Sequence, residues 1–312
     1  MGDERTARGE AQMTGSWGSI ASLLRPRASG RPRQFDVIIM GQGYLEWSPS
    51  MLPHSPVWEG MPGVKSVRAV NDDWQPAPGE LGPTTLVIPF LEKNLRRAPH
   101  GCWGLIPSPR ALETFADKAV FARYARDQQL EDLIPKTYWT PEEARFPMVL
   151  KRTNLAGGQG MAVIKSAEEL AQALASPTFA GHRTVMQEHV AALSDYITHC
   201  ICKDGRILQV RSFEYQQLDS MVIPTPAPEE RTRPADVPAS DLRNFERFLR
   251  PVSYTGPCNF GFRRRPDGRI ALFEINPRFG GSMFRTPHRD YLRRQLKCLT
   301  DNAVWREATP SS

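Results

Sequence analysis

The sequence predicts an α/β protein whose second half has an α+β organisation with a mainly antiparallel sheet. Near the start of the chain, the apolar run FDVIIM at 35–40 ends in glycines, which is typical of a buried parallel strand entering a turn. Apolar residues recur at helical spacing between residues 108 and 130. From residue 183 onward, runs of alternating apolar and polar residues are separated by Asp-Gly turns, the pattern of antiparallel hairpins.

Composition places the chain among globular proteins. Its 312 residues and 40% hydrophobic content suffice for several packed cores. We find no run of about 18 apolar residues that could span a bilayer, and no apolar stretch typical of a secretion signal near the N-terminus. A cytoplasmic protein without membrane contact is therefore expected. The five cysteines are odd in number and scattered, which suits neither a disulfide framework nor a zinc site, so we expect reduced core thiols.

The formal charge of +6 could indicate a protein that binds nucleic acid, because clustered basic residues bind phosphate backbones. Many of the arginines lie in a Gly/Ser/Arg-rich leader at 1–33, which has little apolar periodicity and is predicted to be disordered. The other basic residues are dispersed. Nucleic acid is therefore not the expected partner, although RNA binding through the leader stays an alternative. Anionic small substrates such as nucleotides explain a basic cleft equally well.

The region at 34–110 is expected to form a small and irregular α/β lobe. A second strand-like run, TTLVIPF at 84–90, follows a proline-rich passage at 49–83. Gly41 and Gly43 do not belong to a dinucleotide fingerprint, because the third glycine is missing and YLEWSPS follows instead of a helix.

The middle of the chain predicts a helix at 108–130, a strand at 146–152 and a return strand after a glycine-rich turn. This arrangement is a hairpin and not a strand-to-helix phosphate loop. A helix is predicted at 166–175, where a serine and a glutamate three residues apart form the sequence of a capping box. The later strand candidates are RTVMQEHV, DYITHCIC, RILQVRSFEY, NFGFRRR and RIALFEIN.

The glycine-rich turn indicates a phosphate site. Lys151 ends the preceding apolar strand, and the turn contains Gly157, Gly158 and Gly160. Glycines let backbone amides approach phosphate oxygens beside a fixed ammonium group. An ordinary glycine hairpin next to a surface lysine is the alternative, and this segment alone does not decide between them.

The segment FEINPRFGGS at 273–282 is more specific. Glu274 and Asn276 lie two apart on a predicted strand, so both side chains share one face and offer the hard oxygen ligands that Mg²⁺ prefers. Arg278 adds a planar cation suited to phosphate. The alternative is a solvated sheet face, which the flanking apolar residues disfavour.

Together these motifs resemble the ATP-grasp superfamily, and within it carbamoyl phosphate synthetase-like and related carboxylate-amine ligase domains, over residues 111–285. The resemblance implies an ATP-grasp domain at 111–300, in which two lobes meeting near residue 185 clamp ATP. It would follow the small N-terminal lobe and precede a tail at 301–312. The implied cofactors are ATP and Mg²⁺, with Mn²⁺ as a substitute.

The resemblance also implies nucleotide contacts. Lys118, in the sequence ADK, and Lys151 match the two phosphate-binding bases, and AGGQGMAV matches the flexible lid. VMQEHV is similar to the hinge between the lobes, which implies that Glu188 and the backbone around His189 and Val190 face adenine. Asp195 occupies the place of a ribose-binding glutamate.

For the metal, the resemblance implies that Glu274 bridges two Mg²⁺ ions, that Asn276 binds one of them and that Arg278 contacts phosphate. GPCNFGF at 256–262 is similar to the neighbouring strand that normally supplies another ligand, but Gly261 stands in that place. Asn259 or water would then complete the shell, or one metal would be held weakly. Arg211 is a candidate for contact with phosphate or the acyl intermediate; a salt bridge to Glu214 is the alternative.

The activity implied is formation of an amide or peptide bond through an acyl phosphate, with release of ADP and phosphate. The expected substrates are a small carboxylate and an amine, with amino acids and peptides as candidates. Arg285, His288 and Arg289 are candidate carboxylate anchors, but a solvated basic helix is favoured for them. Alternatives are a small-molecule kinase of the same fold and a non-catalytic nucleotide-binding regulator, and the sequence leaves homo-oligomer formation open.

Overall fold

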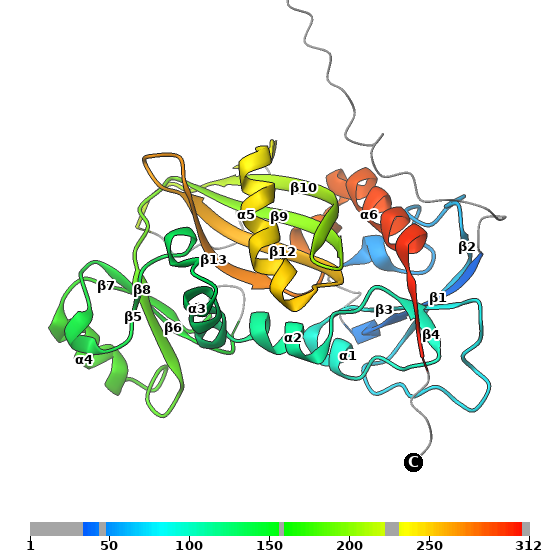
Figure 1. Cartoon of the computed structure of the whole chain (residues 1–312), viewed down its shortest axis with the longest axis horizontal. Coiled ribbons are helices and arrows are strands. Elements are labelled where there is room, and N and C mark those ends of the chain that lie inside the picture. Colours follow the sequence, from blue (N-terminus) through cyan, green and yellow to red (C-terminus); the bar gives the residue numbers. More distant parts are fainter. Residues whose placement is uncertain (1–33, 44–47, 156–158, 222–230, 308–312) are drawn as a thin grey trace, which may run out of the picture. The chain divides into compact units, whose positions relative to one another are not determined.

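A computed structural model describes residues 34–43, 48–155, 159–221 and 231–307 (Figure 1). The predicted disordered leader at 1–33 lies outside these residues. In the part of the chain that the structure describes, no helix has the length and apolar character needed to cross a membrane. The strands of the described residues form three sheets, two of five strands and one of four.

The first sheet has the order β14-β4-β3-β1-β2. Its strands are β1 (Phe35–Met40), β2 (Val64–Val70), β3 (Thr85–Pro89), β4 (Cys102–Gly104) and β14 (Val304–Arg306). β1 runs parallel to both β2 and β3, which confirms the prediction of a buried parallel strand. Residues 304–306, expected in a tail, pair with β4 instead. The short helix α1 (Glu92–Arg96) follows β3.

The second sheet has the order β5-β8-β6-β7, and its pairs are antiparallel. Its strands are β5 (Thr137–Tyr138), β6 (Met148–Arg152), β7 (Met161–Ile164) and β8 (Thr184–Glu188). The pairing of β6 with β7 confirms the predicted glycine hairpin. Helix α4 (Ala167–Ala175) covers a core around Leu150 and Leu170. The Ser166 hydroxyl accepts a hydrogen bond from the Glu169 amide, as an N-cap should.

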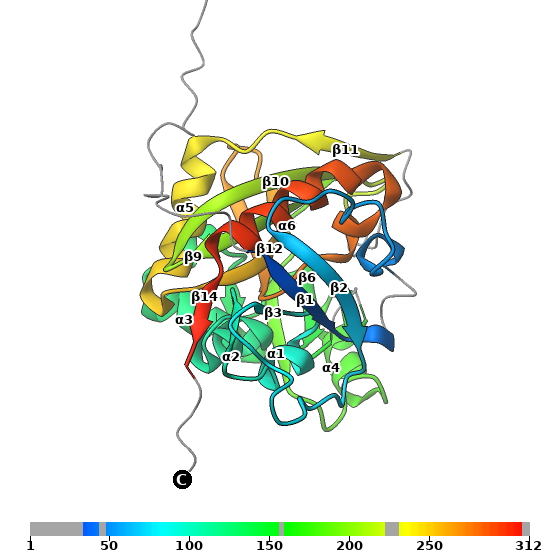
Figure 2. The same cartoon turned by 90° about the vertical axis from the view of Figure 1, so that its right-hand side faces the viewer.

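The third sheet has the order β11-β10-β9-β12-β13 with antiparallel pairs throughout, as predicted for the second half. Its strands are β9 (Ser194–Lys203), β10 (Arg206–Gln216), β11 (Thr232–Ala235), β12 (Gly256–Arg264) and β13 (Ile270–Asn276). One face packs against α2 (Pro109–Ala116), α3 (Lys118–Asp127) and α5 (Ala239–Leu249). The other face meets α6 (Arg289–Asn302), which lies between β10 and the first sheet (Figures 1 and 2).

The helix predicted at 108–130 is two helices, because Asp117 interrupts it. Its backbone is extended at φ −111° and ψ 122°, and its carboxylate accepts hydrogen bonds from the amides of Ala119 and Val120. Asp117 therefore caps α3 and fixes Lys118 at the first position of that helix. Short 3-10 helices lie at Pro49–Met51, Glu131–Leu133, Pro141–Glu143, Arg250–Val252, Gly281–Phe284 and Thr286–His288.

The cysteines are free thiols, as expected for reduced core residues. Four are buried, and Cys298 is partly exposed. Cys202 and Cys258 approach each other in the core between the third sheet and α5, with 3.7 Å between their sulfur atoms.

Candidate active site

The register of the third sheet builds a polar row across four neighbouring strands. The strands β10, β9, β12 and β13 place four residues directly opposite one another: Arg211, His199, Asn259 and Asn276. The next row along the strands contains Phe213, Ile197, Gly261 and Glu274. Residues directly opposite one another share a face of the sheet, so Glu274 and Asn276 lie on the same face as His199 and Arg211.

Glu274 and Asn276 lie side by side, as the strand periodicity predicts. The Asn276 amide nitrogen donates to Glu274 Oε1 at 2.9 Å and to Asn259 Oδ1 at 3.1 Å. One carboxylate and two side-chain amides thus meet at one point of the sheet. This set of hard oxygen donors fits Mg²⁺ by its chemistry.

Gly261 lies directly opposite Glu274. A Cβ atom at this position would lie 3.4 Å from Glu274 Cγ and 3.8 Å from Glu274 Oε1, which is ordinary contact distance. A longer side chain here would therefore reach the carboxylate, and glycine leaves the place without a ligand. Within the described residues, no group of three or more His, Cys, Asp or Glu side chains could hold a metal. A metal-ligand role for Glu274 therefore stays a prediction that rests on one carboxylate.

Two lysines flank Glu274. Lys118 Nζ lies 3.7 Å from Glu274 Oε2 and also donates to the carbonyl of Leu155. Lys151 Nζ donates to Gln187 Oε1 at 2.9 Å and lies 5.2 Å from the centre of the Phe273 ring. At 3% exposure, Lys151 is not the surface lysine of the alternative hypothesis. The structure brings together the two bases and the metal strand that the sequence singled out separately.

The charges of this group are coupled. Burial raises the pKa of Glu274, although a third of its side chain is exposed, but Lys118, the Asn276 hydrogen bond, Lys151 and Arg278 together lower that pKa below its ordinary value. Burial lowers the pKa of Lys151 to about 8, with Glu274 opposing the shift. Glu274 is therefore ionised at neutral pH, and Lys151 is mostly protonated but easily discharged.

The predicted lid falls only partly within the described residues. Gly157 and Gly158 lie outside them. Gly160 has a φ of 60°, and a Cβ there would lie 2.8 Å from the Leu155 side chain and 2.9 Å from that of Arg152. Glycine is therefore required for this turn, while lid motion stays a prediction.

The segment predicted to act as a hinge, around residue 188, lies at the connection from β8 to β9, and its role as a hinge stays a prediction. The Glu188 carboxylate is held by Arg265 through two hydrogen bonds of 2.6 and 2.9 Å. Burial raises the pKa of Glu188, but the Arg265 contact lowers it below its ordinary value. Both His189 ring nitrogens are buried without a hydrogen-bond partner in the described structure. The Val190 carbonyl accepts from Arg263 at 2.8 Å. Contact of these residues with adenine stays a prediction.

Asp195 has a structural environment that differs from the ribose contact implied by the resemblance. It is 5% exposed, and its two oxygens accept hydrogen bonds from Arg263 Nε at 2.6 Å and from Gln217 at 2.7 Å. Arg263 is itself 2% exposed and also donates to the carbonyls of Val190 and Ser220. Both Asp195 oxygens are occupied inside the fold, so we do not assign this residue to a ligand.

Arg278 and Arg211 have different surroundings. Arg278 Nε donates to Glu92 Oε1 of α1 at 2.8 Å, and the charge of Arg278 reaches Glu274. Arg211 lies at the far end of the polar row, about three interstrand spacings or roughly 14 Å from Asn276. Its guanidinium lies 3.9 Å from the centre of the Tyr291 ring and donates to the Tyr291 hydroxyl. The structure does not bring Arg211 together with the lysines and Glu274.

Two alternative environments suggested by the sequence are wrong: a salt bridge from Arg211 to Glu214, and a solvated basic helix for His288. Arg211 does not pair with Glu214, because Glu214 binds Arg233 at 2.9 Å. His288 does not belong to a solvated basic helix, because it is buried, stacks on Phe213 at 3.9 Å and contacts the Ser282 carbonyl. Arg285 donates to the Thr232 hydroxyl at 3.2 Å. A role for Arg285, His288 or Arg289 as a carboxylate anchor stays a prediction.

His199 lies in the polar row, although its sequence context shows no metal-ligand spacing and predicts no catalytic role for it. It is 1% exposed, and its Nε2 atom is 2.9 Å from the Ser282 hydroxyl. Burial, reinforced by His288 and Arg278, lowers its pKa to about 3, so the ring is neutral. A Cβ at Gly280 would lie 2.4 Å from the ring, so only glycine lets this segment approach. The chain after β13 thus crosses the polar row, held by Asn259 at the Arg278 carbonyl and by His199 at Ser282.

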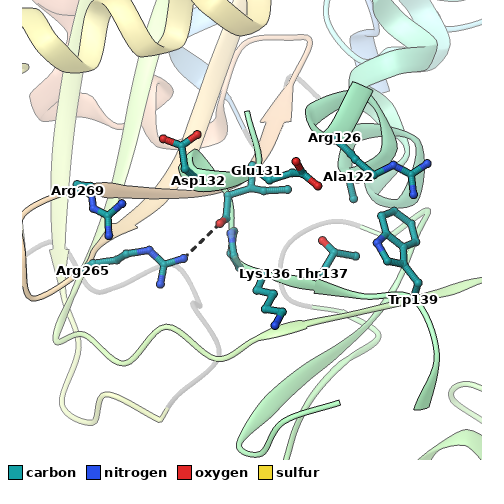
Figure 3. Close-up of a pocket in the computed structure, with 11 residues that line it drawn as sticks. Ala122, Arg126, Glu131, Asp132, Lys136, Thr137, Trp139, Arg265 and Arg269 are labelled. Atoms are coloured by element: carbon teal, nitrogen blue, oxygen red, sulfur yellow. Dashed lines mark hydrogen bonds between the residues drawn. The ribbon is translucent and has the colours of Figure 1, made fainter. Parts of the chain in front are cut away.

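A cavity of about 390 Å³ lies elsewhere, beside the β12–β13 turn (Figure 3). Figure 3 shows Arg265 on one side of it, hydrogen-bonded to the Ile134 carbonyl, and Trp139 on the other. None of Lys118, Lys151 and Glu274 lines this cavity. We place the site at the charged group and not at the cavity, because the paired bases and hard ligands needed for phosphate chemistry converge only there within the described residues.

No protein-family model matches the chain, and no curated protein matches it in sequence. Solved structures do match its fold. Phosphoribosylamine–glycine ligase from Thermotoga maritima aligns with a TM-score of 0.56 at 16% identity, over 80% of this chain and 70% of that one. D-alanine–D-alanine ligase from Helicobacter pylori aligns with a TM-score of 0.55 at 14% identity, over 85% and 98%.

A third similar structure is the L-amino acid ligase from Bacillus licheniformis, with a TM-score of 0.54 at 13% identity, over 89% of this chain and 76% of that one. These proteins are ATP-grasp ligases. The chain therefore has the ATP-grasp fold, which confirms the fold expected from the sequence.

Proposed function

We propose that the protein is an ATP-dependent ligase that joins a small carboxylic acid to an amine through an acyl phosphate, releasing ADP and phosphate. The observation that supports this most directly is the convergence of Lys118, Lys151 and Glu274 within an ATP-grasp fold. Two cations beside one ionised carboxylate can receive a metal-bound polyphosphate. The names of the three similar ligases include amino acids, so amino acids are the first substrates to test.

Each residue has a defined task in this proposal. Lys118 and Lys151 bind phosphate oxygens and hold the γ-phosphate in line with the attacking carboxylate. Arg278 stabilises negative charge that develops on the transferred phosphoryl group. Glu274 and Asn276, with Asn259 beside them, would hold Mg²⁺, which supplies charge neutralisation for the phosphates when bound.

The segment that follows β13 is held for this task by the fold. Asn259 fixes the Arg278 carbonyl at 3.0 Å, and the neutral His199 fixes Ser282 at 2.9 Å. Both contacts are made by strands of the third sheet, so the arginine is positioned by the same sheet that carries Glu274. Such rigid placement reduces the entropy cost of aligning the reacting groups.

The test is a screen with purified protein, Mg²⁺ and ATP. Single amino acids and short peptides are supplied as acids, with hydroxylamine as a general nucleophile, and both ADP and hydroxamate are measured. A ligase gives ADP and hydroxamate together for at least one acid, and Glu274→Gln strongly reduces the formation of both. ADP with a stable phosphorylated product and no hydroxamate would favour the kinase alternative. ATP binding without turnover would favour the non-catalytic regulator. Gly261 motivates this alternative, because glycine supplies no metal ligand at that place.

A further inference from the structure

Glu92 is the acidic residue of the first lobe that reaches the candidate site. It begins α1, directly after β3, and its Oε1 atom accepts a hydrogen bond from Arg278 Nε at 2.8 Å. Its side chain is 32% exposed. Among the described residues, Arg278 is its one hydrogen-bond partner, so Oε2 is left for another group. A first-lobe carboxylate with a spare oxygen thus lies beside the arginine assigned to the transferred phosphate.

The other carboxylates near this region are already engaged. Asp117 caps α3, Asp195 is saturated by Arg263 and Gln217, and Glu188 is held by Arg265. Glu274 is assigned to the metal and lies next to Lys118. Attack on an acyl phosphate needs an uncharged amine, yet an alkylamine is protonated at neutral pH. A group that binds the ammonium ion and takes its proton is therefore required, and Lys118, Lys151 and Arg278 are cations that would repel it.

We propose that Glu92 binds the ammonium group of the acceptor substrate and accepts its proton; this role rests on the ligase function proposed above. The ammonium ion gives one proton to Glu92 Oε2. The freed nitrogen lone pair forms the C–N bond at the acyl carbon, while the C–O bond to phosphate breaks and its electron pair leaves with the phosphate. The second nitrogen proton leaves with the phosphate as hydrogen phosphate. Arg278, bound to Glu92 on one side, stabilises the leaving group on the other.

The chain offers a matched control. Glu80 is also a partly exposed first-lobe glutamate paired with an arginine, Arg68, and its carboxylate accepts hydrogen bonds from Arg68 and from the Ala77 amide, both in the first lobe. Glu80→Gln therefore breaks a comparable ion pair without removing the proposed base. Glu92→Asp keeps a carboxylate at the site and is the conservative variant.

The experiment compares two nucleophiles in the full chain with Mg²⁺, ATP and an acid that the unmodified protein activates in the hydroxylamine screen. Hydroxylamine is largely uncharged at pH 7 and needs no base, whereas an amino acid acceptor is an ammonium ion. Glu92→Gln is expected to form hydroxamate within about threefold of the unmodified protein, but to form amide about 100-fold more slowly. The amide defect should narrow at pH 9, where more amine is uncharged. Glu92→Asp should restore part of the amide rate, and Glu80→Gln should change neither product.

Equal amide formation by Glu92→Gln and the unmodified protein would overturn the role. An equal loss of both products that pH 9 does not relieve would also overturn it, because Glu92 would then only position Arg278. A different result concerns the ligase itself. If the unmodified protein forms no hydroxamate with any acid, the proposed function falls first, and the role of Glu92 falls with it.

Discussion

Two of the arginine–carboxylate pairs in the described residues have opposite character, Asp195 with Arg263 and Glu92 with Arg278. In the first pair both partners are almost fully buried, and Arg263 makes further bonds to the carbonyls of Val190 and Ser220. In the second, the carboxylate is one-third exposed and one of its oxygens has no hydrogen-bond partner among the described residues. The comparison teaches that a saturated pair fixes the backbone, whereas a pair with spare atoms at an open site can exchange its partner for a ligand.

The largest expected effect tests the structural half of this comparison. Asp195→Ala should lower the free energy of unfolding by about 3–5 kcal/mol, because it leaves the Arg263 guanidinium buried without its counter-charge. Glu92→Ala removes the carboxylate of the more exposed pair and should cost less than about 1 kcal/mol. Urea unfolding of both variants measures the difference. Similar losses would show that burial does not distinguish the two pairs.

The second effect concerns chemistry and not stability. Glu274→Gln should reduce ATP turnover by about 10²–10³-fold, the range seen when one electrostatic contact is removed from a reacting centre. Nucleotide binding should fall only modestly, because Lys118 and Lys151 remain. Asn276→Ala removes a neutral ligand, so its defect should be milder and partly relieved by high Mg²⁺. Near-normal turnover by Glu274→Gln in an ADP-release assay would show that this strand is not the metal strand.

The contacts of the candidate site show which features the sequence can predict and which it cannot. Glu274 and Asn276 were found because their relation is local: residues two apart on a strand share a face. The glycine hairpin and the capped helix at 166–175 are local patterns as well. Glu92 and Arg278 are 186 residues apart, and His199 and Ser282 are 83 apart. Their meeting depends on strand order and register, which no local pattern contains.

The environment of Asp195 illustrates the same limit, while its contact with ribose stays an untested prediction. Its distance from Glu188 in the sequence matched a ribose-binding position, but its environment is decided by the pairing of β9 with β12, which sets Asp195 opposite Arg263. The prediction of one continuous helix at 108–130 was wrong for a local reason instead. Asp117 prefers to cap the following amides over continuing the helix, and periodicity alone does not show this.

The third prediction uses the pKa of Lys151. Burial lowers this pKa to about 8, from an ordinary value of 10.5. The protonated ammonium binds phosphate, so below pH 8 ATP affinity should not depend on this group. As pH rises above 8 the free protein loses the proton, and binding must take it up again. Affinity should therefore fall by about fivefold between pH 8 and pH 9, or about 1 kcal/mol.

Equilibrium binding of ATP at pH 7, 8 and 9 measures this dependence. Lys151→Arg is the control, because its side chain stays charged over this range and its curve should be flat. A flat curve in the unmodified protein would show that Lys151 does not meet phosphate. The same pKa shift affects folding. Between pH 8 and pH 10.5 the unfolded chain holds the Lys151 proton and the folded protein does not, so the free energy of unfolding should rise with pH over this range.

The smallest expected effect comes from substitution of Gly261, which contributes no side chain to the proposed metal site beside Glu274. The glycine has no need of an unusual φ, and a Cβ would lie 3.4 Å from Glu274 Cγ, so a side chain fits without backbone strain. Gly261→Gln should add one amide oxygen beside Glu274 and lower the Mg²⁺ concentration needed for half-maximal ADP release by a few fold. Gly261→Met has a similar length and no oxygen donor, so it should leave the midpoint unchanged or raise it. If both variants shift the midpoint equally, the effect is steric, and the single carboxylate of this site is not what limits metal binding.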